Sequence, residues 1–344
     1  MNIWRRVDAL VERAAKVSDL HRHRLHLYAA WRWRSLGRAV PDELLTLERG
    51  ATAVRLAIPG VVRRVREAYD GPMALLKGAD VAAYYPRPEL RPVWDLDLLV
   101  LDADYVHRKL LDFGFAESTS LLPAEHHHLQ PLVWPGFAGN VEIHSAPNWP
   151  LWLVPPRVDE LLAVATTESA LGHGILALPP AHHAIVLAAH LWRDDPMGRL
   201  GQLLDMCLMA EAAEPGALDS LVRRWGVERL WRTTQAAAAR VLRDEQNQPL
   251  GVRMLTQSLE SMRERTLIES RFFEVSSPFF AFEPTVAVAT AVRNVLPSLQ
   301  PAPNESWGTK LRRTPRRLRQ SFWRVSATTD TAPDKTSLRA RHDA

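Results

Sequence analysis

The sequence predicts an α+β protein in which a small mixed β-sheet core has helices before it and a helical domain after it. Apolar residues recur at helical spacing up to residue 70 and again from residue 157. Between these stretches, short runs alternate apolar and polar residues, as half-buried strands do. The chain has 344 residues, 47% of them hydrophobic, which is enough for two ordinary domains with a substantial core.

The first segment, residues 1–70, is predicted to be a helical preface. From Trp4 to Trp33, and again from Asp42 to Ala68, apolar positions follow helical spacing and charged residues occupy the opposite face. We therefore expect helices here and place the strands later in the chain.

The second segment, residues 71–150, is predicted to be the α/β core. Met73–Leu76 is typical of a short buried strand, and Gly78 then turns the chain into a helical segment. A clear helix is expected from Ala103 to Phe113, with Asp102 as its N-cap. Further on, residues 126–134 and 140–146 bracket a Pro-Gly loop, which predicts a hairpin.

The third segment, residues 151–296, is predicted to be a helical domain that closes over the core. The expected helices are Val158–Ala170, Ala181–Trp192, Leu200–Ala213, Leu218–Trp225, Glu228–Leu242 and Val252–Ile268. Asp205 is an acid within an apolar helical stretch. We expect it to meet Arg199, His190 or the cleft, with a structural ion pair favoured, because burying it alone is costly.

The last segment, residues 297–344, is basic and polar and is expected to be a disordered tail. Without this tail the chain would be close to neutral, so the formal net charge of +4 says little about the rest of the chain. No apolar run reaches the ~20 residues of a transmembrane helix. Cys207 is the single cysteine, so no internal disulfide forms and nothing points to export. A cytoplasmic protein is expected.

Two carboxylates alternate with apolar residues in the segment Trp94–Val100. Successive side chains of a strand point to opposite faces, so Asp95 and Asp97 share one face while the apolar residues pack the other. Two unpaired acids at this distance repel each other and lose hydration, and a divalent cation in a cleft offsets both penalties. Magnesium fits best, because it takes hard oxygen ligands and is commonly shared between carboxylates and substrate phosphates.

A second strand, Asn140–Ser145, repeats this alternation and places Glu142 and His144 on one face. Glu142 supplies a third carboxylate. His144 either orients Glu142 or touches substrate, or it is a plain buried and hydrogen-bonded histidine. Upstream, the turn at Gly78 and Ala79 can present backbone N–H groups to phosphate, with Lys77 as a cationic contact.

These motifs resemble the nucleotidyltransferase superfamily of the DNA polymerase beta type, and within it an uncharacterised bacterial family with a Lys-Gly turn. The shared pattern is a glycine turn (Lys77-Gly78-Ala79), an Asp-x-Asp strand (Asp95-Leu96-Asp97) and a later acid (Glu142), in that order. The resemblance covers about Met73 to Trp149 well. One departure is Ala79, where the superfamily usually has serine or glycine.

The resemblance implies a nucleotidyltransferase core and an enzyme that transfers a nucleoside monophosphate from ATP or another nucleoside triphosphate. Asp95, Asp97 and Glu142 would be the catalytic residues and would hold Mg²⁺ or Mn²⁺. The nucleotide would be bound by the Lys77-Gly78-Ala79 turn. Arg91, just before the Asp-x-Asp strand, either pairs with phosphate, which we favour, or forms a salt bridge with Glu89.

The histidine run His126–His128 invites a zinc interpretation, which we do not favour. Consecutive strand residues alternate faces, so only His126 and His128 can share a site, and no cysteine lies near them. We expect His128 or His126 to line the active-site cleft beside Glu142 instead.

The sequence leaves the acceptor unknown, with a hydroxyl or phosphate of a small molecule, sugar or peptide expected. Nucleic acid is not expected as the acceptor, because the one concentrated basic run lies far along the chain. The alternative is a non-catalytic binding or scaffold protein that keeps the fold and contacts an acidic partner through the basic tail. The three retained acids favour the enzyme, since a scaffold does not need converging charge.

Overall fold

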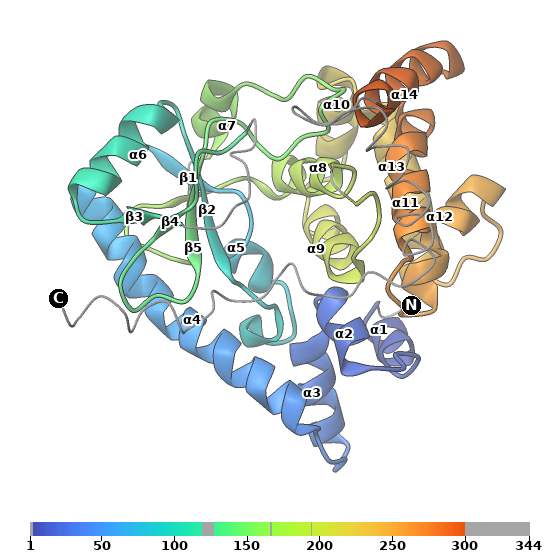
Figure 1. The fold of residues 1–344 in the computed structure, drawn as a ribbon, viewed down its shortest axis with the longest axis horizontal. Coiled ribbons are helices and arrows are strands. Elements are labelled where there is room, and N and C mark those ends of the chain that lie inside the picture. The colour runs from blue at the N-terminus through green and yellow to red at the C-terminus, as the bar shows by residue number, and fades with distance from the viewer. Residues whose placement is uncertain (1–2, 119–126, 166, 194, 300–344) are drawn as a thin grey trace, which may run out of the picture.

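The computed structural model describes residues 3–118, 127–165, 167–193 and 195–299. It confirms the mixed α+β class. The sheet lies on one side of the molecule in Figure 1, helices α4 and α6 lie outside it, and most of the remaining helices lie beyond its other face.

One seven-stranded mixed sheet runs in the order β3-β4-β5-β2-β1-β7-β6. Its two central pairings are parallel β2–β5 and antiparallel β1–β2. The strands are β1 (Met73–Leu75), β2 (Asp95–Val100), β3 (Ala116–Glu117), β4 (Leu132–Val133), β5 (Asn140–His144), β6 (Thr167–Glu168) and β7 (Leu176–Ala177). The hairpin of β6 and β7 extends the sheet beyond residue 150, because β7 pairs in parallel with β1.

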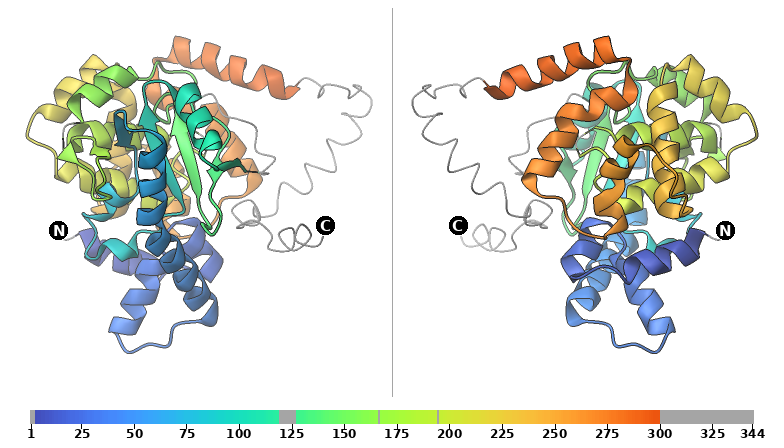
Figure 2. Two further views of the ribbon diagram at one scale, coloured as in Figure 1. Left: turned by 90° about the vertical axis from the view of Figure 1, so that its left-hand side faces the viewer. Right: turned by 90° about the vertical axis from the view of Figure 1, so that its right-hand side faces the viewer.

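The helices account for most of the remaining described chain. They are α1 (Ile3–Val11), α2 (Val17–Arg22), α3 (His26–Ser35), α4 (Asp42–Ala68), α5 (Ala79–Ala82), the 3₁₀ turn η1 (Pro88–Leu90), α6 (Ala103–Asp112), α7 (Val158–Val164), α8 (Pro180–His190), α9 (Leu200–Glu211), α10 (Ala217–Arg224), α11 (Glu228–Leu242), α12 (Leu250–Glu260), α13 (Leu267–Ala281) and α14 (Pro284–Leu299). In Figure 2, α14 projects from the body, and α3 and α4 form a long hairpin.

The two faces of the sheet pack into different apolar cores because strand side chains alternate. Leu96, Leu98 and Val100 of β2 join α4 and α6 in one core. Leu99, on the opposite face, joins the core formed by α8 to α13. Asp95 and Asp97 share the face of Leu99, so the acids face the helical part of the molecule.

The N-terminal helices divide between these two cores. Helices α1 to α3 pack with the helical core, whereas α4 packs on the sheet. Arg6 of α1 donates from Nε to the carbonyl of Val241 at 2.9 Å, and the amide of Gly201 donates to the carbonyl of His23 at 2.9 Å. The segment is helical as predicted, but α1 to α3 belong physically to the helical body.

Several predicted helix bounds match the structure and others are wrong. Asp42–Ala68 and Glu228–Leu242 coincide with α4 and α11. The predicted helix Val158–Ala170 ends at Val164, because the following residues pair as β6. The predicted helix Val252–Ile268 is two helices, because Met262 has a left-handed φ of 47° and Thr266 opens α13 with a capping box.

Asp102 caps α6 as predicted, since its side chain accepts a hydrogen bond from the amide of Tyr105 at 2.9 Å. The hairpin predicted between residues 126 and 146 is also present, with β4 antiparallel to β5. Within the described residues, no helix is both long and apolar enough to cross a membrane.

His23 makes folding stability depend on pH. Its Nδ1 accepts from the amide of Leu200 at 3.3 Å, and Nε2 lies 3.1 Å from the carbonyl of Arg263, which fits a neutral ring protonated on Nε2. Burial lowers the pKa of His23 from 6.5 to about 4. A folded-state pKa below the unfolded value gives stability that is present above pH 6.5 and lost as pH falls towards 4.

We therefore expect urea unfolding midpoints to drop between pH 7 and pH 4.5, with His23 contributing up to about 1.4 kcal/mol per pH unit. The variant His23→Gln removes this titration, so its pH dependence should be shallower even where its stability at pH 7 is lower. An unchanged slope in His23→Gln would contradict the assignment.

Candidate active site

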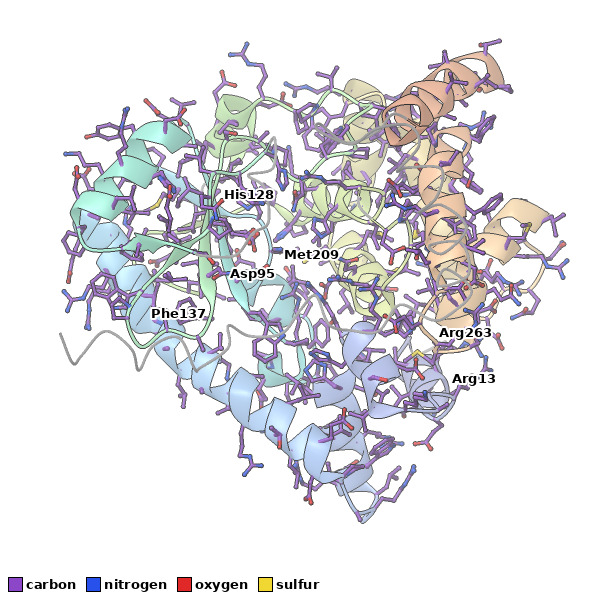
Figure 3. The ribbon with its side chains drawn as sticks, in the orientation of Figure 1. Arg13, Asp95, His128, Phe137, Met209 and Arg263 are labelled. Carbon is purple, nitrogen blue, oxygen red and sulfur yellow. The ribbon has the colours of Figure 1, made fainter. Side chains whose placement is uncertain are left out.

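The parallel pairing of β2 with β5 brings the predicted acids together. In this register Asp97 lies opposite Glu142, and Asp95 lies opposite Asn140. Because both strands point these side chains to the same face, the three carboxylates converge on the side of the sheet that faces the helical body. The labelled Asp95 lies on this part of the sheet in Figure 3.

Lys77 follows β1, the neighbouring strand, and lies between two of the acids. Its Nζ is 2.9 Å from Oδ2 of Asp95 and 3.1 Å from Oδ1 of Asp97. Burial alone would lower the pKa of Lys77, but the charges of the two aspartates outweigh it and raise that pKa. Lys77 therefore stays charged and compensates the acids, whereas the sequence assigned it to phosphate.

His144 bridges the other two acids from β5. Its Nε2 lies 3.1 Å from Oδ1 of Asp97 and 3.6 Å from Oε2 of Glu142, and its side chain is fully buried. Burial alone would lower the pKa of His144, but its contacts with Asp97 and Glu142 raise it. His144 thus touches both acids directly, which is more than the orienting role expected from the sequence.

The surroundings push the pKa values of Asp97 and Glu142 in opposite directions. Burial alone would raise the pKa of Asp97, but Lys77 and His144 hold it far below its usual range. Burial raises the pKa of Glu142, and the charges of Asp97 and Asp95 add to that effect. Two neighbouring carboxylates with separated pKa values suit different roles, one a permanent anion and the other able to take up a proton.

The donor set fits a divalent cation. Ligand atoms of Asp97, Glu142 and His144 lie within 4.8 Å of one another. Oδ2 of Asp97 is buried and has no hydrogen-bond partner among the described residues, so it keeps an acceptor available for a cation. The sequence predicted Asp95, Asp97 and Glu142 as metal ligands. In the tightest group His144 takes the place of Asp95, whose Oδ2 binds Lys77.

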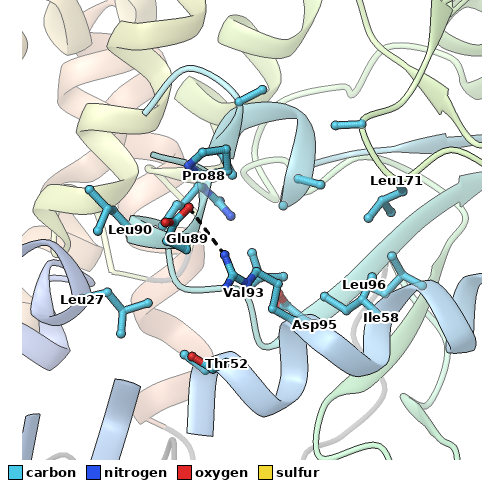
Figure 4. A pocket seen from close by; sticks show the side chains of 18 of the residues that line it. Leu27, Thr52, Ile58, Pro88, Glu89, Leu90, Val93, Asp95, Leu96 and Leu171 are labelled. Carbon is cyan, nitrogen blue, oxygen red and sulfur yellow. Dashed lines mark ion pairs between the residues drawn. The ribbon is translucent and has the colours of Figure 1, made fainter. Parts of the chain in front are cut away.

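The glycine turn has the predicted form. Gly78 has a φ of 86°, which favours glycine, and the short helix α5 begins at Ala79. Both residues border a cavity of about 500 Å³ between α4 and the start of β2 (Figure 4). Its walls are largely apolar, and they include Leu27, Ala51, Thr52, Ile58, Ala82, Val93, Asp95 and Leu96. The ion pair of Arg55 and Glu89, at 3.6 Å, spans one side of it.

Arg91 lines the same cavity, but its guanidinium is engaged elsewhere. It pairs with Asp205 of α9, with Nε 3.0 Å from Oδ1 and Nη2 2.9 Å from Oδ2, and both side chains are buried. Tyr85 donates to the same carboxylate at 2.8 Å. Arg91 does not form the alternative salt bridge with Glu89, which pairs with Arg55 and Arg87 instead. The assignment of Arg91 to phosphate stays a prediction. The ion pair expected for Asp205 is present, but its partner is Arg91.

The hairpin brings histidines to the active-site face. His128 forms a bridge with His144 of β5, and their ring centroids are 5.4 Å apart. His126 lies outside the described residues. His127, which the sequence did not single out, lies 5.3 Å from the His144 ring and contacts Arg193 of the loop after α8. Arg193 also donates to Oδ1 of Asn148 at 2.6 Å.

Comparison with known proteins gives one result. A family model described as "Uncharacterised nucleotidyltransferase" matches residues 9–243, which is more than half of the chain. Neither the curated proteins nor the solved structures give a match. The matched range spans the glycine turn, the three acids and both Arg91 and Asp205.

The Arg91–Asp205 pair is expected to support stability. Removing one partner leaves a buried charge uncompensated, so Asp205→Ala should lower the free energy of unfolding by roughly 3–5 kcal/mol. The double variant Arg91→Met with Asp205→Leu buries no charge and should recover much of this loss. Urea unfolding of the three proteins measures both effects. A single variant as stable as the wild type would contradict this account.

Proposed function

Because the chain belongs to the uncharacterised nucleotidyltransferase family, we propose that it is a metal-dependent enzyme that moves a nucleoside monophosphate from a nucleoside triphosphate onto an acceptor. The observation that carries the proposal is the register of β2 against β5, which sets Asp97 opposite Glu142 on an inward-facing side of the sheet. Three carboxylates gathered in this way cost free energy to bury, so a role in packing alone does not explain them.

Asp95, Asp97 and Glu142 would hold Mg²⁺ or Mn²⁺, with His144 beside them. A divalent cation there supplies Lewis-acid stabilisation of the phosphate oxygens. In the transfer, the acceptor oxygen forms a bond to the α-phosphorus, the bond to the bridging oxygen breaks, and pyrophosphate leaves. Glu142 takes the acceptor proton, for which its raised pKa suits it better than Asp97.

Lys77 and His144 keep the acids in place before any substrate binds. Each contacts Asp97, and the charge of Lys77 offsets part of the negative charge that burial would otherwise make costly. Asp97 is thereby held from two sides.

The cavity beside Asp95 is suited to the base and sugar of the nucleotide. Its volume of about 500 Å³ falls within the range of small-molecule sites, and its walls are largely apolar. Gly78, Ala79 and Asp95 all border this cavity, so the phosphates of such a nucleotide would lie beside them. The acceptor is expected to be a hydroxyl or phosphate of a small molecule, sugar or peptide.

One observation favours the scaffold alternative. Lys77 already binds Asp95 and Asp97, so this part of the cluster is compensated without a cation. A protein that had lost catalysis could keep the fold in that way. Group transfer measured directly separates the two functions.

The first test uses the full chain with each α-labelled nucleoside triphosphate, Mg²⁺ or Mn²⁺, and candidate acceptors, including the protein itself. Transfer of label should fall by at least about 100-fold in the double variant Asp95→Asn with Asp97→Asn, because both metal-binding carboxylates are lost. The exposed Asp104→Asn on α6 is the matched control and should label as the wild type does. Label transfer that survives in the double variant would sink the proposal.

The double variant uses asparagine and not alanine because the buried ammonium of Lys77 contacts both aspartates. The buried ammonium of Lys77 loses one of its two carboxylate partners in Asp97→Ala and keeps only Asp95, whereas Asp97→Asn keeps an oxygen within reach. We therefore expect Asp97→Ala to be less stable to urea than Asp97→Asn, by roughly 1–3 kcal/mol. Equal stability of the two variants would mean that the contact between Lys77 and Asp97 contributes little.

A further inference from the structure

Arg24 occupies an unusual position between α2 and α3. Its φ is 57°, in the left-handed region that costs an L-residue other than glycine about 1 kcal/mol. The turn is fixed against α9, because the amide of Gly201 bonds the carbonyl of His23 and a Cβ on Gly201 would lie 3.0 Å from Cβ of Arg24. The packing therefore holds Arg24 in one place despite the strain.

Arg24 is a half-buried residue without a counter-charge among the described residues. Among the residues that the structure describes, no hydrogen bond or ion pair reaches its side chain, whereas the nearby Arg22 is paired with Asp195 at 2.7 Å. Partial burial of a cation without a partner is costly. A bound anion would remove that cost.

The positive charge of Arg24 interacts with groups on the active-site side of the molecule. It acts to lower the pKa of Lys77 after β1, of Tyr85 after α5 and of His190 at the end of α8. The charge of Asp97 also acts on His190. Leu27, three residues after Arg24 in the chain, lines the cavity that Gly78 and Asp95 border. Arg24 thus lies within electrostatic range of the site and next to a segment that lines the cavity.

We propose that Arg24 binds the β- and γ-phosphates of the nucleoside triphosphate, on the far side of Lys77 from the reacting α-phosphate. This inference rests on the proposed function and names a contact for its substrate. Arg91, which the sequence assigned to phosphate, is sequestered by Asp205, and Arg193 is bonded to Asn148. Arg24, by contrast, has no hydrogen-bond or ion-pair partner among the described side chains, so its planar fork remains open to phosphate oxygens.

The same contact would assist the transfer itself. When the bond from the α-phosphorus to the bridging oxygen breaks, negative charge builds on the departing pyrophosphate. A guanidinium already in place stabilises that charge without reorganising at the moment of reaction. Arg24 would therefore affect both the affinity for the triphosphate and the rate of transfer.

The test measures dissociation constants of the full chain with Mg²⁺ by calorimetry, for a nucleoside triphosphate, the matching monophosphate and inorganic tripolyphosphate. In Arg24→Gly, affinity for the triphosphate and for tripolyphosphate should fall about 10- to 100-fold, as expected for a lost charge-assisted contact. Affinity for the monophosphate should change little. Arg24→Lys keeps the positive charge but not the planar fork. Its affinity for the triphosphate and for tripolyphosphate should lie between those of the wild type and Arg24→Gly.

Two controls separate binding from folding. Arg24→Gly also relieves the left-handed strain, so its melting temperature should be at least that of the wild type. Arg5→Ala removes an exposed arginine of α1 and should bind all three ligands as the wild type does.

The possible failures are distinguishable. If the wild type binds the triphosphate and Arg24→Gly binds it equally well, or loses the monophosphate to the same degree, the assignment of Arg24 is overturned and the proposed function stands. If the wild type binds neither the triphosphate nor tripolyphosphate, both are overturned.

Discussion

The site depends on the side-by-side pairing of β2 and β5, which places like charges next to each other on an inward face. Such an arrangement needs compensation inside it, which Lys77 supplies by its charge just after β1 and His144 by its contact with Asp97 from β5. The central strands thus form a single electrostatic unit. Asp97 is at its centre, since it contacts both Lys77 and His144 while its buried Oδ2 is unbonded among the described residues.

Much of this unit could be predicted from local patterns. Strand alternation fixes which side chains share a face, so the convergence of Asp95 and Asp97 and the common face of Glu142 and His144 follow from the sequence. The helix bounds Asp42–Ala68 and Glu228–Leu242 follow from a long, regular apolar period. Short elements were harder to predict, because the pairing of β6 with β7, and of β7 with β1, overrides the helical period seen just before residue 170.

Contacts between distant parts of the chain could not be predicted in this way. Arg91 meets Asp205 across 114 positions, and no local pattern says which of several acids an arginine will meet. Arg24 shows no signal in the sequence, since the role proposed for it rests on an unusual backbone angle and on the lack of a counter-charge among the described residues. The catalytic roles assigned to the acids stay predictions, whereas the family and the mixed fold are established.

The N-terminal helices are divided between two cores, and this limits how the chain can be truncated. Helices α1 to α3 contribute Leu10, Leu20 and Tyr28 to the core shared with α8 to α13, although more than a hundred residues separate them along the chain. A fragment starting at β1 would leave that apolar surface open to water and prone to self-association. The first helices of the chain complete the core of α8 to α13, so this core can close only after both segments have been synthesised.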